Sequence, residues 1–297
     1  MTTEFIPLGA NFTSLKQEQK AFSETPPISP EVDDEQYRLH RRFDRMGRLI
    51  GDHGMQTMFA SHVMIIGLGG VGSWAAESLV RSGVGRITLV DFDLICITNT
   101  NRQLHAMRGN TGKPKVEIMA QRLQAINPRC QVICERRFYN AESSHELLAQ
   151  KPDLVIDAID NLNAKAHLIA TCYQQKIPLV ASGGASGRLD PTQIREADMT
   201  EVQGDAFIAA VRKLLRKTYN FGHERWSIPT IHSLEPITNP QELAYDEGQG
   251  FLCVCPQGNN GLHSCDRRNV IYGTASFVTG SFGLACAAAA VRMLLHR

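Results

Sequence analysis

The sequence of 297 residues has almost no net charge, few aromatic residues and no paired cysteine motif. Its formal net charge is +1, and 7% of its residues are aromatic. A chain of this kind has no global field that attracts nucleic acid, so a large anionic partner needs local basic patches, and we expect no DNA partner. With 43% hydrophobic residues, the chain is long enough for one large α/β core, alone or with an excursion.

Residues 1–29 lack an apolar block, which predicts that no signal peptide is present. The eight cysteines are scattered, which favours a reduced, cytoplasmic protein. Cys253, Cys255 and Cys265 lack Cys-x-x-Cys spacing, so we expect packing or a reactive thiol there, with zinc as the alternative. The apolar segment 270–295 is interrupted by glycines. It predicts a buried strand followed by a helix, and membrane association through this segment is the alternative.

One short stretch organises the chain. Residues 63–66 are four consecutive apolar residues, typical of a buried parallel strand, and residues 73–80 have the pattern of a helix. Between them lies a Gly-x-Gly-Gly-x-Gly motif made of Gly67, Gly69, Gly70 and Gly72. A second strand, 87–91, ends in Asp91, where a ribose hydroxyl needs an acceptor. This order and spacing predict a nucleotide site at the helix N-terminus.

The rest of the chain to residue 190 alternates between strand and helix patterns. We expect helices at 115–126, 141–150 and 163–175, and strands at 131–134, 154–157 and 177–182. After residue 190 the period changes, and short strands accompany a basic amphipathic helix at 205–219. The predicted fold is therefore α/β: a Rossmann-like, mostly parallel sheet with helices on both faces, plus a C-terminal α/β extension with antiparallel strands.

Three regions follow from these patterns. Residues 1–34 are proline-containing and polar, which predicts a flexible N-terminal extension. Residues 35–190, beginning with an arginine-rich helix at 35–59, form the predicted nucleotide-binding core, which the family resemblance given below implies is an ATP-binding adenylation core. Residues 191–297 form a C-terminal part of the same domain, associated with the substrate or a dimer. The helix at 205–219 is either a solvated surface helix or a patch for RNA phosphates, with cations at Arg212, Lys213, Arg216 and Lys217.

The carboxyl edge of the predicted sheet collects charged side chains. Asp157 and Asp160 end one strand, and the other polar candidates at this edge are Asp91, Asn99, Arg102 and Lys115. Cations neutralise phosphates and a carboxylate holds a metal, so this set suits a triphosphate with Mg²⁺. A dehydrogenase needs no such cations. The pattern favours nucleotidyl or phosphoryl transfer over hydride transfer.

Five motifs between residues 42 and 187 resemble the signature set of the ThiF-like and ubiquitin-activating-enzyme-like adenylyltransferases. They are the glycine motif, Asp91–Asp93, Asn99–Gln103, Gly112–Lys115 and Asp157–Asn161. Within this superfamily, residues 71–77, 98–105 and 190–194 are most similar to the tRNA threonylcarbamoyladenosine dehydratases. The zinc cysteines of the molybdopterin and thiamin branch are absent.

The resemblance implies an activity. Such enzymes use ATP to adenylate the threonyl carboxylate of N6-threonylcarbamoyladenosine at position 37 of tRNA. Attack by the carbamoyl group then closes a ring, with net loss of water and release of AMP and pyrophosphate. The alternative within the family is ThiF-like adenylation of the C-terminal glycine of a ubiquitin-like or sulfur-carrier protein. A nucleotide-binding regulatory module without turnover is a third hypothesis.

The resemblance also implies residue roles. The glycine loop binds the nucleotide, Asp91 binds ribose, and Asp160 holds Mg²⁺. Asn99, Arg102 and Lys115 grip the phosphates, and Asp93 and Gln103 complete the binding set. An arginine acts on the partner subunit's site in a homodimer, with Arg48 as first candidate and Arg45 as second. Further expectations are a monovalent cation (Na⁺ or K⁺) and a cysteine-desulfurase system as partner.

Overall fold

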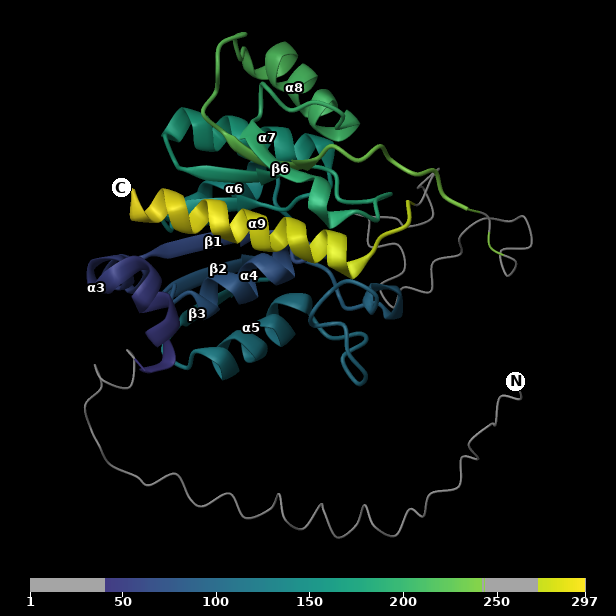
Figure 1. Ribbon diagram of the computed structural model, residues 1–297. Coiled ribbons are helices and arrows are strands. Elements are labelled where there is room, and N and C mark those ends of the chain that lie inside the picture. Colours follow the sequence, from purple (N-terminus) through teal and green to yellow (C-terminus); the bar gives the residue numbers. More distant parts are fainter. Residues whose placement is uncertain (1–40, 242, 244–271, 297) are drawn as a thin grey trace, which may run out of the picture. The chain divides into compact units, whose positions relative to one another are not determined.

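A computed structural model describes residues 41–241, 243 and 272–296. In this part of the chain, seven strands form one sheet in the order β3-β2-β1-β4-β5-β7-β6 (Figure 1). The strands are β1 (His62–Ile66), β2 (Arg86–Val90), β3 (Gln131–Glu135), β4 (Leu154–Asp157), β5 (Leu179–Ser182), β6 (Ile194–Asp198) and β7 (Pro229–Ser233). The predicted α/β class and mostly parallel sheet are confirmed.

The antiparallel strands belong to the same sheet as the Rossmann-like core. Neighbouring strands from β3 to β7 are parallel, and β6 pairs antiparallel with β7, so that Ile194 lies opposite Ser233. Because β7 pairs directly with β5, the predicted C-terminal extension continues the sheet rather than forming an appendix to it. The carboxyl ends of β1, β2, β4, β5 and β7 therefore share one edge.

Helices cover both faces of the sheet. They are α3 (Asp44–Ala60), α4 (Gly72–Arg81), α5 (Lys115–Ile126), α6 (Ala141–Leu148), α7 (Leu162–Gln175), α8 (Ala206–Tyr219) and α9 (Ser276–Leu295). Two short 3₁₀ helices, η1 (Ile97–Asn99) and η2 (Pro191–Gln193), lie in the connections. One apolar cluster joins α3, α4, α5 and α9 to the sheet, and a second joins α6, α7 and α8 to it.

Alternation along β1 shows how the sequence serves both clusters. Val63 and Ile65 belong to the cluster under α4 and α9, whereas Met64 and Ile66 belong to the cluster under α7. Successive side chains of a strand point to opposite faces, so a strand covered on both sides has to be apolar throughout. This requirement explains the continuous apolar run before the glycine motif.

Helix α9 is a core helix of this fold. It packs against α4 and against strands of the sheet, and Phe282 and Cys286 have no exposed surface. By length and composition it is also apolar enough to cross a membrane, but 56% of its most apolar window is buried inside the structure. The predicted strand before it is wrong for the residues described there, because 272–275 have no regular structure.

The first described helix differs from its prediction. Helix α3 begins at Asp44, and it contains a break at Gly51, where φ is 73° and ψ is 173°. The described residues from Phe43 onward form one compact unit, to which Arg41 and Arg42 do not belong. The predicted flexible extension at 1–34, the start of the helix at 35–40, Cys253, Cys255 and Cys265 lie outside the described residues. The boundary at residue 190 stays a prediction.

Candidate functional site

The glycine motif forms the corner between β1 and α4, where the chain's strand order switches sides. Gly67 has φ of 93°, and a Cβ there would lie 2.6 Å from the carbonyl O of Ala158. A Cβ at Gly72 would lie 1.8 Å from the carbonyl O of Gly67. A Cβ at Gly69 would meet no protein atom within 4 Å. Two glycines thus permit the fold of the corner, and the third faces open space.

Helix α4 starts at this corner without a side-chain cap. Its N-cap is Val71, whose side chain accepts no hydrogen bond, although Ser73 Oγ donates to the carbonyl O of Gly69 at 2.8 Å. Uncapped N–H groups and the positive end of the helix dipole make such a start suited to a phosphate. The open space at Gly69 lies beside it, so the corner fits an anionic nucleotide tail.

Asp91 anchors the loop to the end of β2. Its Oδ2 accepts a hydrogen bond from the Leu68 N–H at 2.7 Å, and its Oδ1 accepts one from the Asp93 N–H at 2.8 Å. Each carboxylate oxygen keeps capacity for a second donor. Asp91 is therefore buried beside the glycine loop, and its role as the acceptor for a ribose hydroxyl stays a prediction.

Lys115 is bound by carboxylates in this structure. Its Nζ lies 2.7 Å from Asp93 Oδ2 and 3.9 Å from Asp91 Oδ2, and the side chain is 7% exposed. Burial alone disfavours the ammonium, but these two carboxylates outweigh it and raise the pKa of Lys115 above its ordinary value. Burial raises the pKa of Asp91, and the Lys115 ammonium opposes that rise. Lys115 thus stays charged beside the glycine loop.

Residues 96–103 form a compact turn next to the loop. Asn99 is buried, and its Oδ1 accepts a hydrogen bond from the Cys96 N–H at 3.0 Å. Arg102 is partly exposed, and its guanidinium donates to the Thr98 carbonyl O at 2.9 Å. Trp74 of α4 donates from Nε1 to the Arg102 carbonyl O at 3.1 Å, which ties this turn to the glycine corner.

Gln103 is as buried as Lys115 and Asp91, and its contacts lie within the turn. It is buried, and its Oε1 lies 3.0 Å from Nε2 of His105, which has no exposed surface. In this structure Gln103 supports the turn from inside. Its assignment to the binding set stays a prediction.

Asp160 and Asp157 follow the same strand but have different environments. Asp160 is exposed at the carboxyl edge, close enough to Lys115 to raise the pKa of that lysine. Asp157 is fully buried and forms an ion pair with Lys165 of α7, with Nζ and Oδ2 2.7 Å apart. Burial raises the pKa of Asp157, and Lys165 opposes the rise. The sequence analysis did not identify Lys165. The signal that could have pointed to it is a lysine in the helix that follows the strand ending at Asp157.

The donor set fits magnesium better than a tightly caged metal. No cluster of three or more His, Cys, Asp or Glu side chains suited to a metal occurs among residues 41–241, 243 and 272–296. Mg²⁺ is commonly held by one or two carboxylates together with nucleotide phosphates and water. The exposed carboxylate of Asp160, beside an open phosphate corner, matches that requirement.

The predicted trans arginines lie on α3. Arg48 donates from Nε to Asp44 Oδ2 at 3.1 Å, and its side chain is 72% exposed. Arg45 is 94% exposed. Both side chains are available to another molecule, and the assignment of either to a partner's site stays a prediction.

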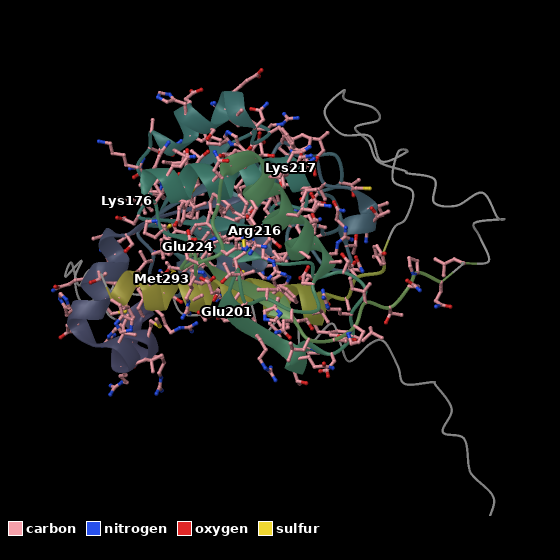
Figure 2. The ribbon with its side chains drawn as sticks, turned by 90° about the horizontal axis from the view of Figure 1, so that it is seen from above. Lys176, Glu201, Arg216, Lys217, Glu224 and Met293 are labelled. Atoms are coloured by element: carbon pink, nitrogen blue, oxygen red, sulfur yellow. The ribbon has the colours of Figure 1, made fainter. Side chains whose placement is uncertain are left out.

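The four basic residues of helix α8 fall into two groups: two arginines that contact the protein and two exposed lysines. Arg212 donates to the backbone carbonyl groups of Met199, Thr200 and Val202 at 2.8–3.1 Å. Arg216 lies over the Trp226 ring, 5.4 Å from its centroid. Lys213 and Lys217 are exposed, and Figure 2 labels Arg216 and Lys217. The two arginines thus have contacts within the protein, and the four-cation RNA patch stays a prediction.

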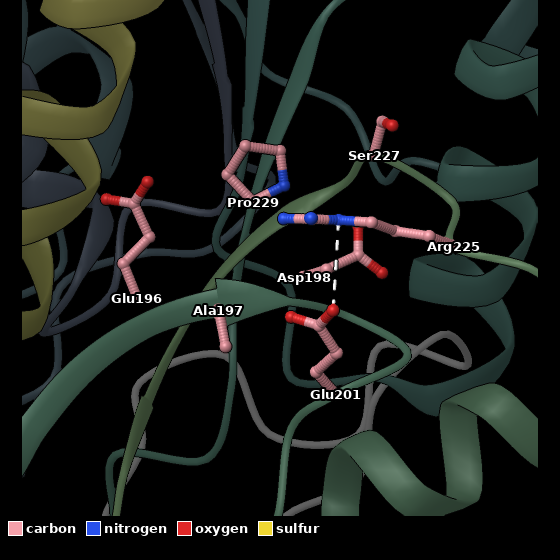
Figure 3. Close-up of a pocket in the computed structure, with 7 residues that line it drawn as sticks. All are labelled: Glu196, Ala197, Asp198, Glu201, Arg225, Ser227 and Pro229. Carbon is pink, nitrogen blue, oxygen red and sulfur yellow. Dashed lines mark ion pairs between the residues drawn. The ribbon is translucent and has the colours of Figure 1, made fainter.

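A separate hollow of about 510 Å³ lies beside the antiparallel strands (Figure 3). Its lining residues are Glu196, Ala197, Asp198, Glu201, Arg225, Ser227 and Pro229. Arg225 pairs with Glu201 there at 3.9 Å, and the remaining charges are acidic. An acidic lining repels phosphates, so this hollow is not a second nucleotide site.

Comparison with known proteins gives consistent results. The ThiF family model matches residues 43–297. The tRNA threonylcarbamoyladenosine dehydratase of Haemophilus influenzae is 39% identical over 260 residues, covering 86% of this chain and 94% of that protein.

Two solved structures of the E. coli tRNA N6-threonylcarbamoyladenosine dehydratase, TcdA, are similar in fold. The complex with AMP has a TM-score of 0.76 at 34% identity, covering 90% of this chain and 98% of that one. The complex with ATP has a TM-score of 0.74 at 35% identity, covering 86% and 95%. The similarity thus extends over nearly the whole fold and includes nucleotide-bound states.

Proposed function

Because this chain belongs to the ThiF family, we propose that it is an ATP-dependent dehydratase of N6-threonylcarbamoyladenosine at position 37 of tRNA. The observation that carries the proposal is the open glycine corner with Lys115 and Asp160 at one sheet edge. The relatives named above match 86% and 90% of this chain. Molybdopterin and thiamin branch members need zinc cysteines that the sequence lacks in paired form.

ATP binds with its phosphates at the start of α4 and its ribose at Asp91. Lys115 and Arg102 neutralise phosphate charge, and Mg²⁺ held at Asp160 would supply additional positive charge when bound. Since Lys115 is paired with Asp93 in this structure, its ammonium is kept charged before the nucleotide arrives. The phosphates then provide a second anionic partner at the same place.

The reaction consists of two substitutions, the first at the α-phosphorus of ATP and the second at the acyl carbon. The threonyl carboxylate attacks the α-phosphorus of ATP, so that pyrophosphate leaves and an acyl adenylate forms. The carbamoyl group then attacks the acyl carbon, the ring closes and AMP leaves with one carboxylate oxygen. The net change in the nucleoside is the loss of one water. Holding both reacting groups within one nucleoside makes the second step unimolecular.

The test uses purified full-length protein, ATP, Mg²⁺ and tRNA that carries the open threonylcarbamoyl group. Nucleoside mass spectrometry should show conversion to a product lighter by one water, with one AMP formed per product. ATP–pyrophosphate exchange with a ubiquitin-like or sulfur-carrier protein serves as the other arm. Exchange with that protein and not with tRNA would replace this proposal with the alternative activity.

We further propose a homodimer in which Arg48 reaches the partner's site. Its exposed guanidinium on α3 supports the idea. Mixing equal amounts of Arg48→Ala and Asp160→Ala subunits tests this proposal. If the arginine acts in trans, each mixed dimer has one intact site, and random exchange of subunits should restore up to about a quarter of wild-type activity. No recovery would place Arg48 outside the site. A monovalent cation and a cysteine-desulfurase partner stay predictions.

A further inference from the structure

The side chain of Lys165 holds the β4 end of the turn that presents Asp160, and the first helical hydrogen bond of α7 holds the other end. The Lys165 Nζ pairs with Oδ2 of Asp157 at 2.7 Å and donates to the Asp157 carbonyl O at 3.3 Å. The Lys165 N–H donates to the carbonyl O of Asn161 at 2.9 Å. Asp157 is the last residue of β4, and Asn161 is the N-cap of α7. The turn between them therefore has fixed ends.

The same turn touches the glycine corner. The Ala158 N–H donates to the carbonyl O of Ile66 at 3.0 Å. The backbone carbonyl O of Ala158 lies against Gly67 so closely that a Cβ would approach it to 2.6 Å. A shift of residues 158–160 would therefore move Asp160 relative to the phosphate corner.

A buried ion pair is a poor way to gain stability. Neither Lys165 nor Asp157 has exposed surface, so both charges lose their hydration. Apolar side chains of similar volume stabilise a core as well or better. Unlike apolar packing, the pair can fix the position of one residue, because the ammonium forms an ion pair with the Asp157 carboxylate and a hydrogen bond with the Asp157 carbonyl O.

We propose that Lys165 is a positioning residue that fixes the turn 158–161, so that the Asp160 carboxylate meets a nucleotide-bound Mg²⁺. The inference rests on the proposed ATP site and adds a residue that does not touch the nucleotide. It predicts that Lys165 controls how much Mg²⁺ tightens ATP binding, separately from how stable the protein is.

The test is calorimetric binding of ATP to the full-length protein, once in excess Mg²⁺ and once in EDTA. The ratio of the two dissociation constants measures the Mg²⁺ enhancement. We expect Lys165→Met to reduce this ratio by about fivefold or more while ATP affinity in EDTA changes by less than about twofold. Asp160→Ala should reduce it at least as far.

The double variant Asp157→Leu, Lys165→Met separates positioning from stability. It replaces the ion pair with apolar side chains, so thermal unfolding should return towards the wild-type midpoint while the Mg²⁺ enhancement stays low. It also carries the test if Lys165→Met alone does not fold. A double variant with the wild-type enhancement would overturn the proposal, since a merely structural pair predicts that result.

A matched control breaks an ion pair away from the turn. Arg122 of α5 pairs with Glu77 of α4, so Arg122→Met should lower stability and leave the Mg²⁺ enhancement unchanged. An equal loss in that variant would assign the effect to general destabilisation and refute the positioning role. Failure of the wild-type protein to convert tRNA, with the ATP and Mg²⁺ results as expected, would refute the dehydratase activity and leave the role of Lys165 standing.

Discussion

Two glycine-rich turns follow parallel strands of the same sheet, residues 67–72 after β1 and residues 183–187 after β5. In the first, a Cβ at Gly69 would meet nothing within 4 Å. In the second, a Cβ at Gly183 would lie 2.5 Å from Oδ2 of Asp205, which already accepts the Gly184 N–H at 2.9 Å. Similar composition at the same edge thus gives one open corner and one filled corner.

The difference lies in what caps the helix that approaches each turn. Asp205 is the N-cap of α8, and its Oδ1 accepts the Ile208 N–H at 3.0 Å. The guanidinium of Arg188, 2% exposed, donates to the Gly184 carbonyl O. Protein groups therefore satisfy the second turn. At the first turn Val71 offers no such acceptor, which leaves α4 to bind an anion.

The largest effect is expected at Gly72. Its Cβ would lie 1.8 Å from the carbonyl O of Gly67, so Gly72→Ala has to displace backbone. We expect a loss of roughly 3 kcal/mol or more in the free energy of unfolding, together with loss of ATP binding. Urea denaturation and calorimetry measure the two effects. Wild-type stability would mean that the corner is looser than described.

Gly183→Ala should cost less and affect a different property. The new methyl group would push on the Asp205 side chain and weaken the cap of α8, for a loss of about 1–3 kcal/mol. ATP affinity should stay within about twofold of wild type, because the change lies in the filled turn. Gly184→Ala is the matched control, since its Cβ would have only ordinary contacts from 3.7 Å. A large fall in ATP affinity with Gly183→Ala would contradict the separation of the two turns.

Acid should also act differently on two buried histidines, His105 and His232. His105, near Lys115, has its pKa lowered from 6.5 to about 3 by burial and by that ammonium. Burial also lowers the pKa of His232, but there Asp205 opposes the change. Between pH 6.5 and about 3, His105 binds a proton in the unfolded chain but stays neutral in the folded chain. The stabilisation that His105 contributes as a buried neutral group is therefore complete above about pH 6.5 and is lost as the pH drops towards 3.

We expect His105→Gln to flatten this fall by about 1.4 kcal/mol per pH unit between pH 6 and 4, and His232→Gln to flatten it less. Urea denaturation at a series of pH values measures both slopes. The comparison would fail if the two variants had equal slopes, or if His105→Gln kept the wild-type slope.

Sequence reasoning located the corner well because its cues are local. A continuous apolar strand, close-set glycines and Asp91 at the next strand end describe one βα unit, and the structure brings them together. It could not foresee that Lys115 is paired with Asp93, because that contact joins a strand end to a helix 22 residues later.

The sequence did not reveal several other features of the structure. The amphipathic spacing of α8 distinguishes a buried face from an outer face, but it does not reveal that carbonyl groups of residues 199–202 lie within reach of Arg212. The apolar residues before α9 suggested a strand, yet 272–275 join no sheet. Lys165 was missed because its partner Asp157 had been assigned to the ligand edge rather than to the interior. For Arg212 and Lys165, a tertiary contact decided the role.

The smallest change, Gly69→Ala, tests the comparison most directly. The backbone at Gly69 does not adopt a positive φ, and its Cβ would meet no protein atom within 4 Å, so the free enzyme should accept alanine. A smaller entropy of the unfolded chain should even stabilise it by up to about 1 kcal/mol. If the open space is a phosphate cradle, the methyl group occupies it and ATP affinity falls by about tenfold, equivalent to about 1.4 kcal/mol. Thermal unfolding and calorimetry on one sample separate these effects. Unchanged ATP affinity would mean that the space at Gly69 is ordinary solvent, and the contrast between the two turns would then be one of packing alone.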